Sequence, residues 1–341
     1  MITAKHIDPT AREALGSYAV EVASAVWTPL GNAGGFSGAR LWRGAAGDGQ
    51  QLCLRAWPVR RTTEEKVRFI HRAQDCCRLP FIPRLWRTAD GDTCVRCSEQ
   101  FWEVSDWMPG RADFHVHPTD GRLDEVMRAL AAIHDAWRPA EPREAPCPAV
   151  ERLLGAFREW RILVQSGWKP DFQAPYPSEL HDRARRAWQV LLGGALTAEY
   201  SLLEWTNRPV PVQTCMCDVW HDHILYVDDA VTGIIDFGAV KIDCVAIDLA
   251  RLLGSIIPDE RNRLDRALAL YSAARSVPQV ILDLVPVLDR AGITIGLTNW
   301  LRWLYLEKRP YSDGQQVVRR MDALLRRVEA KKPTDLLPWA V

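Results

Sequence analysis

The chain has 341 residues, and its 43 lysines and arginines balance 43 aspartates and glutamates, giving a formal net charge of zero. That balance excludes the broad basic surface of a nucleic-acid or anionic-membrane binder, so we expect neither as a partner. Nine irregularly spaced cysteines indicate reduced thiols, and no apolar run suggests a leader or a membrane span. The sequence predicts a soluble cytoplasmic protein, long enough for two lobes with separate cores.

The first hundred residues predict strands around a single helix. Residues 18–30 alternate weakly, 39–44 and 51–58 resemble two further strands, and 92–107 resemble a hairpin. Apolar residues at helical spacing predict a helix over 62–77, capped by Thr62 or Thr63. His71 is expected on the surface of that helix.

Helical patterns dominate after Gly110. Helices are predicted over 122–137, 149–165 and 178–196 and again from about residue 246, with a proline-rich loop at 140–149. A hairpin with its turn at Asp228–Asp229 interrupts the helices. The prediction is an α+β fold of two lobes, with a strand-rich lobe at 1–106, a hinge at 107–110 and a helical lobe at 111–341.

The glycine-rich segment "GNAGGFSG", residues 31–38, lies between two predicted strands. Such a loop can fold over phosphates and offer them backbone N–H groups, with Gly34, Gly35 and Ser37 as the residues concerned. A plain hairpin turn is the alternative. A strand cation, Arg55, and a helix beginning with acids follow the loop in the order of a kinase small lobe.

The stretch "CMCDVWHDHILYVDDAVTGIIDFG", residues 215–238, carries the carboxylates that phosphoryl transfer needs. One residue must position the attacking hydroxyl, and oxygen ligands must hold magnesium on the phosphates. Asp218 opens a loop, His223 follows five residues later, and Asp236 precedes Phe-Gly after a strand pattern. This order around a glycine-rich first lobe is more specific than any one motif.

From about Trp27 to Gly254 the chain resembles the aminoglycoside phosphotransferase and choline kinase family, which has a protein-kinase-like fold. The hinge "DWMPG", the helix "ALAAIHDAW" and the segment "GIIDFGAVKIDCVAIDLA" match the family's patterns. The resemblance implies transfer of the γ-phosphoryl group of ATP to a hydroxyl of a small molecule. The acceptor cannot be read from the sequence.

The resemblance also implies roles for single residues. Asp218 would orient or deprotonate the acceptor hydroxyl, and Asp236 would bind Mg²⁺. The glycine loop would cover the phosphates, and the backbone at two hinge residues would hold adenine. Asp248 would brace the catalytic loop. The residues assigned to the nucleotide are Gly34, Gly35, Ser37, Arg55, Glu64, Glu65, Asp106 and Met108, with Arg55 pairing with Glu64 or Glu65.

Three positions depart from the family pattern. Met216 stands where the family has a packing histidine, a change that a flexible apolar side chain tolerates. Arg55 replaces lysine, as in the choline kinase branch. His223 replaces the asparagine that is the second metal ligand, although magnesium prefers oxygen. Asp222 could substitute, one metal could suffice, or Mn²⁺ could be used; the alternative is an impaired pseudokinase that binds nucleotide or a partner.

A third reading takes Cys215, Cys217, His221 and His223 as a zinc site, because these are zinc's ligand types. The spacing is unlike that of structural zinc sites, and the zinc reading explains nine residues where the kinase reading explains about two hundred. It remains the weakest of the three.

Overall fold

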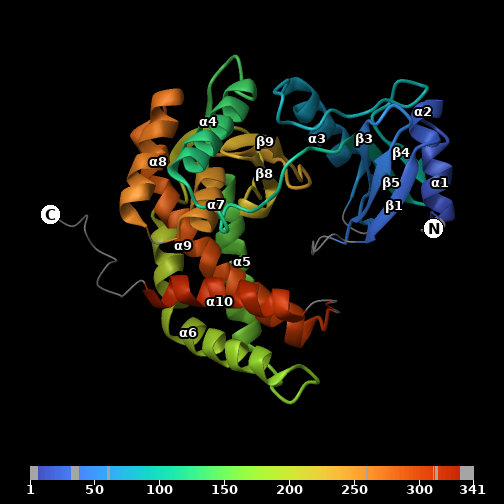
Figure 1. Cartoon of the computed structure of the whole chain (residues 1–341). Helices are drawn as coiled ribbons and strands as arrows, with labels where there is room; N and C mark the ends of the chain where they lie inside the picture. The colour runs from blue at the N-terminus through green and yellow to red at the C-terminus, as the bar shows by residue number, and fades with distance from the viewer. Residues whose placement is uncertain are drawn as a thin grey trace. The chain divides into compact units, whose positions relative to one another are not determined.

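The computed structural model describes residues 7–31, 38–59, 62–258, 260–309, 311 and 314–330, apart from the side chains of 193–196 and 330 (Figure 1). The chain forms two compact units. The first contains residues 1–138 and 218–241, and the second contains residues 139–217 and 242–341. The predicted lobe boundaries at 106 and 110 stay a prediction.

A five-stranded antiparallel sheet is the centre of the first unit, in the order β1-β2-β3-β5-β4. The predicted hairpin is formed by its last two strands in sequence, β4 and β5. The strands are β1 (Val26–Gly31), β2 (Arg40–Ala45), β3 (Gln51–Ala56), β4 (Val95–Cys97) and β5 (Gln100–Asp106).

The segment before the sheet differs from the prediction. It forms helices α1 (Pro9–Leu15) and α2 (Val20–Ala23) before β1 begins, so the expected strand over 18–30 is wrong in its first half. Both helices pack their apolar residues on one face of the sheet. The core shared by helices and sheet comprises Ala11, Ala14, Leu15, Tyr18, Val22, Trp27, Trp42, Leu52, Leu54, Ala56, Cys97, Trp102 and Val104.

Helix α3 (Glu64–Cys76) is the helix predicted over 62–77. Thr63 caps it, with its hydroxyl accepting a hydrogen bond from the Lys66 amide. The buried residues Val67, Ile70 and His71 lie on one helical face. The prediction that His71 is a surface residue is wrong, because its side chain is only 2% exposed.

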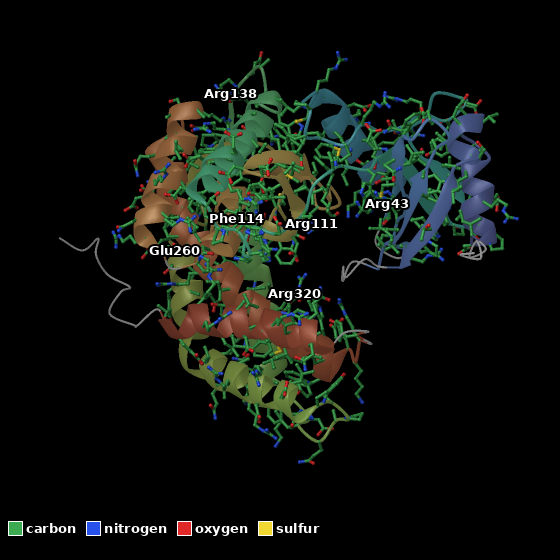
Figure 2. The ribbon with its side chains drawn as sticks, in the orientation of Figure 1. Arg43, Arg111, Phe114, Arg138, Glu260 and Arg320 are labelled. Carbon is green, nitrogen blue, oxygen red and sulfur yellow. The ribbon has the colours of Figure 1, made fainter. Side chains whose placement is uncertain are left out.

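The first unit also contains α4 (Asp120–Ala136), the 3-10 helix η2 (His221–His223) and the hairpin of β8 (Ile224–Val227) and β9 (Ala230–Ile234), whose turn lies at Asp228–Asp229 as predicted. The segment leading into α4 is tied to β8 by two backbone hydrogen bonds between Arg111 and Tyr226. Phe114 of the same segment is buried, with its ring 6.1 Å from that of Tyr226 (Figure 2 labels Arg111 and Phe114).

The second unit is mainly helical. A small sheet in the order β10-β7-β6 accompanies the helices, and its strand β6 lies in the segment predicted as a loop at 140–149, so that prediction is wrong in part. The strands are β6 (Arg143–Pro146), β7 (Pro209–Cys215) and β10 (Lys241–Asp243). The helices are α5 (Pro148–Gln165), α6 (Ser178–Leu203), α7 (Ala246–Ile256), α8 (Arg261–Ala274), α9 (Gln279–Leu301) and α10 (Gly314–Ala330).

The predicted α+β class is confirmed, with an antiparallel sheet in the N-terminal part and helices in most of the rest. Across the described part of the chain, no helix is both long and apolar enough to cross a membrane.

Candidate active site

Asp248 fixes the backbone just before Asp218. Its carboxylate, fully buried in the first turn of α7, accepts hydrogen bonds from the amides of Met216 at 2.8 Å and Cys217 at 2.6 Å. Cys217 has a φ of +63°, a left-handed conformation that is uncommon for residues other than glycine and that the two bonds help to hold. The bracing role implied for Asp248 is therefore confirmed.

Met216 is fully buried, which agrees with its expected role as a core filler. Asp218 follows this braced pair in sequence and is partly buried.

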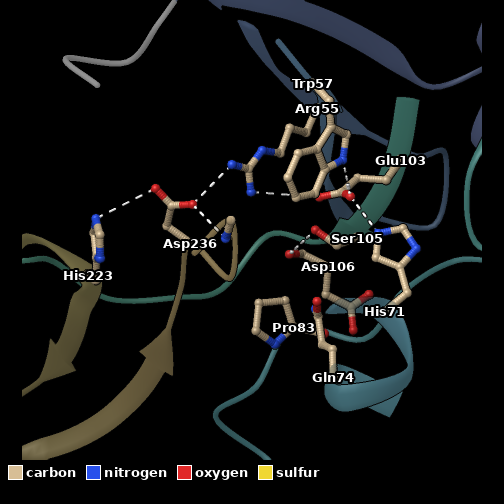
Figure 3. A network of polar contacts seen from close by, with 11 residues as sticks. Arg55, Trp57, His71, Gln74, Pro83, Glu103, Ser105, Asp106, His223 and Asp236 are labelled. Carbon is tan, nitrogen blue, oxygen red and sulfur yellow. Dashed lines mark hydrogen bonds and ion pairs between the residues drawn. The ribbon is translucent and has the colours of Figure 1, made fainter. Parts of the chain in front are cut away.

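Asp236 lies two residues beyond the end of β9, with a left-handed φ of +62°. Its Oδ1 accepts a hydrogen bond from Arg55 Nη2 at 3.0 Å and one from the Gly238 amide at 3.2 Å (Figure 3). Burial alone would raise the pKa of this carboxyl, but the charge of Arg55 and the Gly238 hydrogen bond outweigh it and lower the pKa. The side chain is nevertheless 40% exposed, so the carboxylate is both charged and accessible.

Arg55 comes from β3 and is 12% exposed. Besides Asp236, it pairs with Glu103 of β5, at 3.9 Å between Nη1 and Oε1, and its guanidinium lies 4.3 Å from the Trp57 ring centre. Burial would lower the pKa of Arg55, and the two carboxylates raise it instead. Its buried Nε has no hydrogen-bond partner among the described residues.

The structure does not bring Arg55 together with Glu64 or Glu65. Both glutamates lie exposed in the first turn of α3, where the helix dipole stabilises negative charge. Glu64 pairs with Arg68 at 2.7 Å. The expected pairing with Arg55 is therefore wrong. The buried face of α3 begins only at Val67.

Sequence reasoning missed Glu103 and His71. Glu103 Oε2 contacts His71 Nε2 at 2.6 Å and accepts a hydrogen bond from Trp57 Nε1 at 2.5 Å. The signal that could have found Glu103 is an acidic residue placed between Trp102 and Val104 in the middle of the strand pattern "QFWEVSDW".

Further cations lie near this centre. Lys66 of α3 is partly buried, which lowers the pKa of its amine, and the charges of Lys241 and Arg55 lower it further while Asp236 opposes them. The surroundings of Asp236 are thus rich in positive charge, as a polyphosphate site requires.

The hinge residues lie at the end of β5. The Asp106 amide donates to the Arg84 carbonyl, and the Asp106 carboxylate accepts from Trp86 Nε1. The Met108 side chain lies so close to Gly233 of β9 that a Cβ on this glycine would be 2.7 Å from Met108 Cβ. Gly34, Gly35 and Ser37 lie outside the described residues.

His223 contacts Asp236 through Nε2, at 3.7 Å from Oδ2 (Figure 3). The same Nε2 accepts a hydrogen bond from the Trp220 indole at 2.8 Å, which engages the lone pair that a metal would need. Asp236, a hard oxygen ligand, fits Mg²⁺ or Mn²⁺. The role of His223 as a second ligand stays a prediction, and the neighbouring Asp222 contacts His221 at 3.3 Å.

The zinc reading has no structural support. No set of three or more His, Cys, Asp and Glu side chains in the described ranges is arranged to hold a metal ion. Cys215 is fully buried, its thiol donates to the Asp243 carbonyl at 3.3 Å, and burial raises the pKa of the thiol well above its usual range. A thiol in this state is a poor zinc ligand.

Known proteins resemble this chain in sequence and in fold. The sequence profile of the phosphotransferase enzyme family matches residues 29–281. Homoserine kinase from Bradyrhizobium diazoefficiens is 27% identical over 210 residues, 55% of this chain and 63% of that protein. Homoserine kinase from Methylorubrum populi is 31% identical over 183 residues, 52% and 50% of the two chains. The chain thus spans between half and two thirds of the length of these relatives.

Solved structures share the fold. An aminoglycoside phosphotransferase from Alicyclobacillus acidocaldarius superposes with a TM-score of 0.56 at 14% identity, covering 96% of each chain. Spectinomycin phosphotransferase, solved in complex with ADP and spectinomycin, superposes with a TM-score of 0.61 at 10% identity, covering 88% of this chain and 90% of its own. The predicted protein-kinase-like fold is confirmed, and the chain belongs to the phosphotransferase enzyme family that includes the aminoglycoside phosphotransferases.

Proposed function

We propose that the protein is an ATP-dependent phosphotransferase that moves the γ-phosphoryl group to a hydroxyl of a small molecule. The observation that carries this proposal is the pair formed by Arg55 and Asp236. A strand cation suited to phosphate and an accessible, charged carboxylate suited to magnesium meet at 3.0 Å, although 181 residues separate them in sequence. Phosphoryl transfer depends on this combination of charges and on positioning.

The roles of the other residues follow from their places. Asp218 would hold the acceptor hydroxyl, on a backbone that Asp248 keeps in one conformation. Arg55 and Lys66 would bind phosphate oxygens, and the Asp106 carbonyl and Met108 amide would receive adenine. Mg²⁺ or Mn²⁺, when bound at Asp236, would neutralise charge on the phosphates. Gly34, Gly35 and Ser37 remain the predicted phosphate loop, and a cytoplasmic location remains a prediction.

The acceptor is the open part of the proposal. The relatives are named homoserine kinases, and the structural neighbours are named an aminoglycoside phosphotransferase and a spectinomycin phosphotransferase, so an amino-acid alcohol and an aminoglycoside are the first two classes to compare. The fold by itself does not choose between them, because one fold serves many substrates.

Acceptor-dependent release of ADP tests the proposal. Purified protein would be assayed with ATP and Mg²⁺ against homoserine, spectinomycin, an aminoglycoside and choline, with Asp218→Asn as the matched variant. We expect one class to stimulate ADP release, and Asp218→Asn to lower that rate by about 10²-fold or more while nucleotide still binds. Equal rates in the wild type and Asp218→Asn would contradict the assigned role.

A nucleotide-binding protein without turnover is the second candidate, and the Trp220–His223 contact favours it. His223→Asn separates the two, because asparagine offers an oxygen ligand at this position. We expect a rise in Mg²⁺-dependent turnover if the metal site limits catalysis. An unchanged rate in this variant would count against position 223 as the limit.

A further inference from the structure

A buried polar network holds the guanidinium of Arg55 from the side opposite Asp236 (Figure 3). Glu103 lies directly across from Arg55 in the register of β3 and β5. Its Oε1 is 3.9 Å from Arg55 Nη1, and its Oε2 receives both His71 Nε2 and Trp57 Nε1. Arg55 therefore contacts one oxygen of the Glu103 carboxylate, and His71 and Trp57 contact the other.

Strand alternation explains why Glu103 faces this way. Its neighbours Trp102 and Val104 point into the core under α1 and α2, so Glu103 points to the opposite face of the sheet, towards α3. Burial would raise the pKa of this carboxyl, but hydrogen bonding from His71 and the charges of His71 and Arg55 lower it. A buried carboxylate is tolerated only with such partners.

His71 connects the network to α3. Its side chain is 2% exposed, and its Nδ1 lies 2.7 Å from Thr93 Oγ1, so both ring nitrogens are engaged and the ring orientation is fixed. The helix thus reaches Arg55 through a histidine and a strand glutamate. The glutamates in its own first turn do not take part.

We propose that Glu103 is the positioning residue for Arg55, and that His71 is the contact through which α3 holds Glu103. This rests on the proposed function, because it takes Arg55 as a ligand of the nucleotide phosphates. Arg55 then has one fixed buried anion, Glu103, and one accessible anion, Asp236. An incoming phosphate would compete with Asp236 for the guanidinium while Glu103 keeps it in place.

Calorimetric titrations with ATP and with adenosine, both in saturating Mg²⁺, test the inference. Adenosine shares the adenine contacts but has no phosphate for Arg55 to bind. For Glu103→Gln we expect the Kd for ATP to rise about tenfold, and that for adenosine to stay within about twofold. Glu99→Gln, an exposed glutamate of the same unit, is the matched control and should change neither.

A double-mutant cycle adds a second measurement. If Glu103 acts through Arg55, adding Glu103→Gln to Arg55→Met should produce no further loss of ATP affinity. If Glu103→Gln does not fold by circular dichroism, His71→Gln takes its place, with a smaller loss of ATP affinity expected in the same direction.

Two results would overturn the positioning role. One is an equal loss of ATP and adenosine affinity, which indicates a structural effect on the whole lobe. The other is unchanged ATP binding in Glu103→Gln together with a loss in Glu64→Gln, which would return the role to the helix glutamate. A wild type that binds neither ligand would instead overturn the proposed function, and with it the role of Arg55 as a phosphate ligand.

Discussion

Replacing Asp248 by asparagine should destabilise the protein and impair the loop before Asp218. The carboxylate accepts two backbone amides, at 2.8 and 2.6 Å, and is fully buried. An asparagine side chain of the same shape can accept only one of them through its oxygen, and its NH₂ group then faces the other N–H.

The expected loss in unfolding free energy follows from these contacts. One charge-assisted bond becomes a weaker neutral one, and one buried amide loses its acceptor, for a total of about 3 kcal/mol. Because Cys217 depends on the same carboxylate to hold its left-handed φ, we also expect turnover to fall more than nucleotide affinity.

Urea unfolding of the wild type and Asp248→Asn measures the first effect, with Asp283→Asn as control because Asp283 is exposed on α9. A change below about 0.5 kcal/mol in Asp248→Asn would refute the reasoning, since it would mean that the two hydrogen bonds contribute little. A loss of equal size in Asp283→Asn would point to a general effect of charge removal.

Three further outcomes are expected. Gly110→Ala should lower the unfolding free energy measured in urea by about 3 kcal/mol. The φ of Gly110 is +103°, and the added Cβ would lie 2.5 Å from Thr232 Oγ1 and 2.7 Å from the Tyr226 carbonyl oxygen. A loss below about 1 kcal/mol would contradict this reasoning. Folding lowers the pKa of Glu103, so its contribution to stability is present above the ordinary glutamate pKa and is lost as the pH falls through the folded value. The unfolding free energy of Glu103→Gln should therefore fall less steeply with decreasing pH than that of the wild type. Parallel curves of unfolding free energy against pH would argue against this. Cys215 should be alkylated by iodoacetamide far more slowly than the exposed Cys76, as read by mass spectrometry, and equal rates would contradict its burial.

Local patterns predicted the elements whose signals lie within one segment. Helix α3 was predicted with its Thr63 cap, and the hairpin β8–β9 with its turn at Asp228–Asp229, because spacing and turn chemistry are local properties. Helices α1 and α2 were not predicted. Helix α2 has only four residues, and the alternation of apolar and polar residues around it resembles a strand. Strand β6 was hidden by prolines, which edge strands tolerate.

The site shows a similar division. Asp236 and Arg55 were predicted from motif order, and the structure brings them together. Their surroundings depend on tertiary contacts that no spacing reveals: Glu103 faces Arg55 only because β3 and β5 pair in one register, and His71 reaches it only because α3 turns that face inward. The sequence therefore indicated the wrong partner for Arg55.

Titration of the wild type and Asp236→Ala with ATP, in Mg²⁺, in Mn²⁺ and without metal, tests the central claim most directly, with the melting temperature as readout. Binding to the native state raises the melting temperature by mass action. The account predicts a metal-dependent rise in the wild type that disappears in Asp236→Ala. A rise of the same size in both proteins, or no rise with either metal, would contradict it.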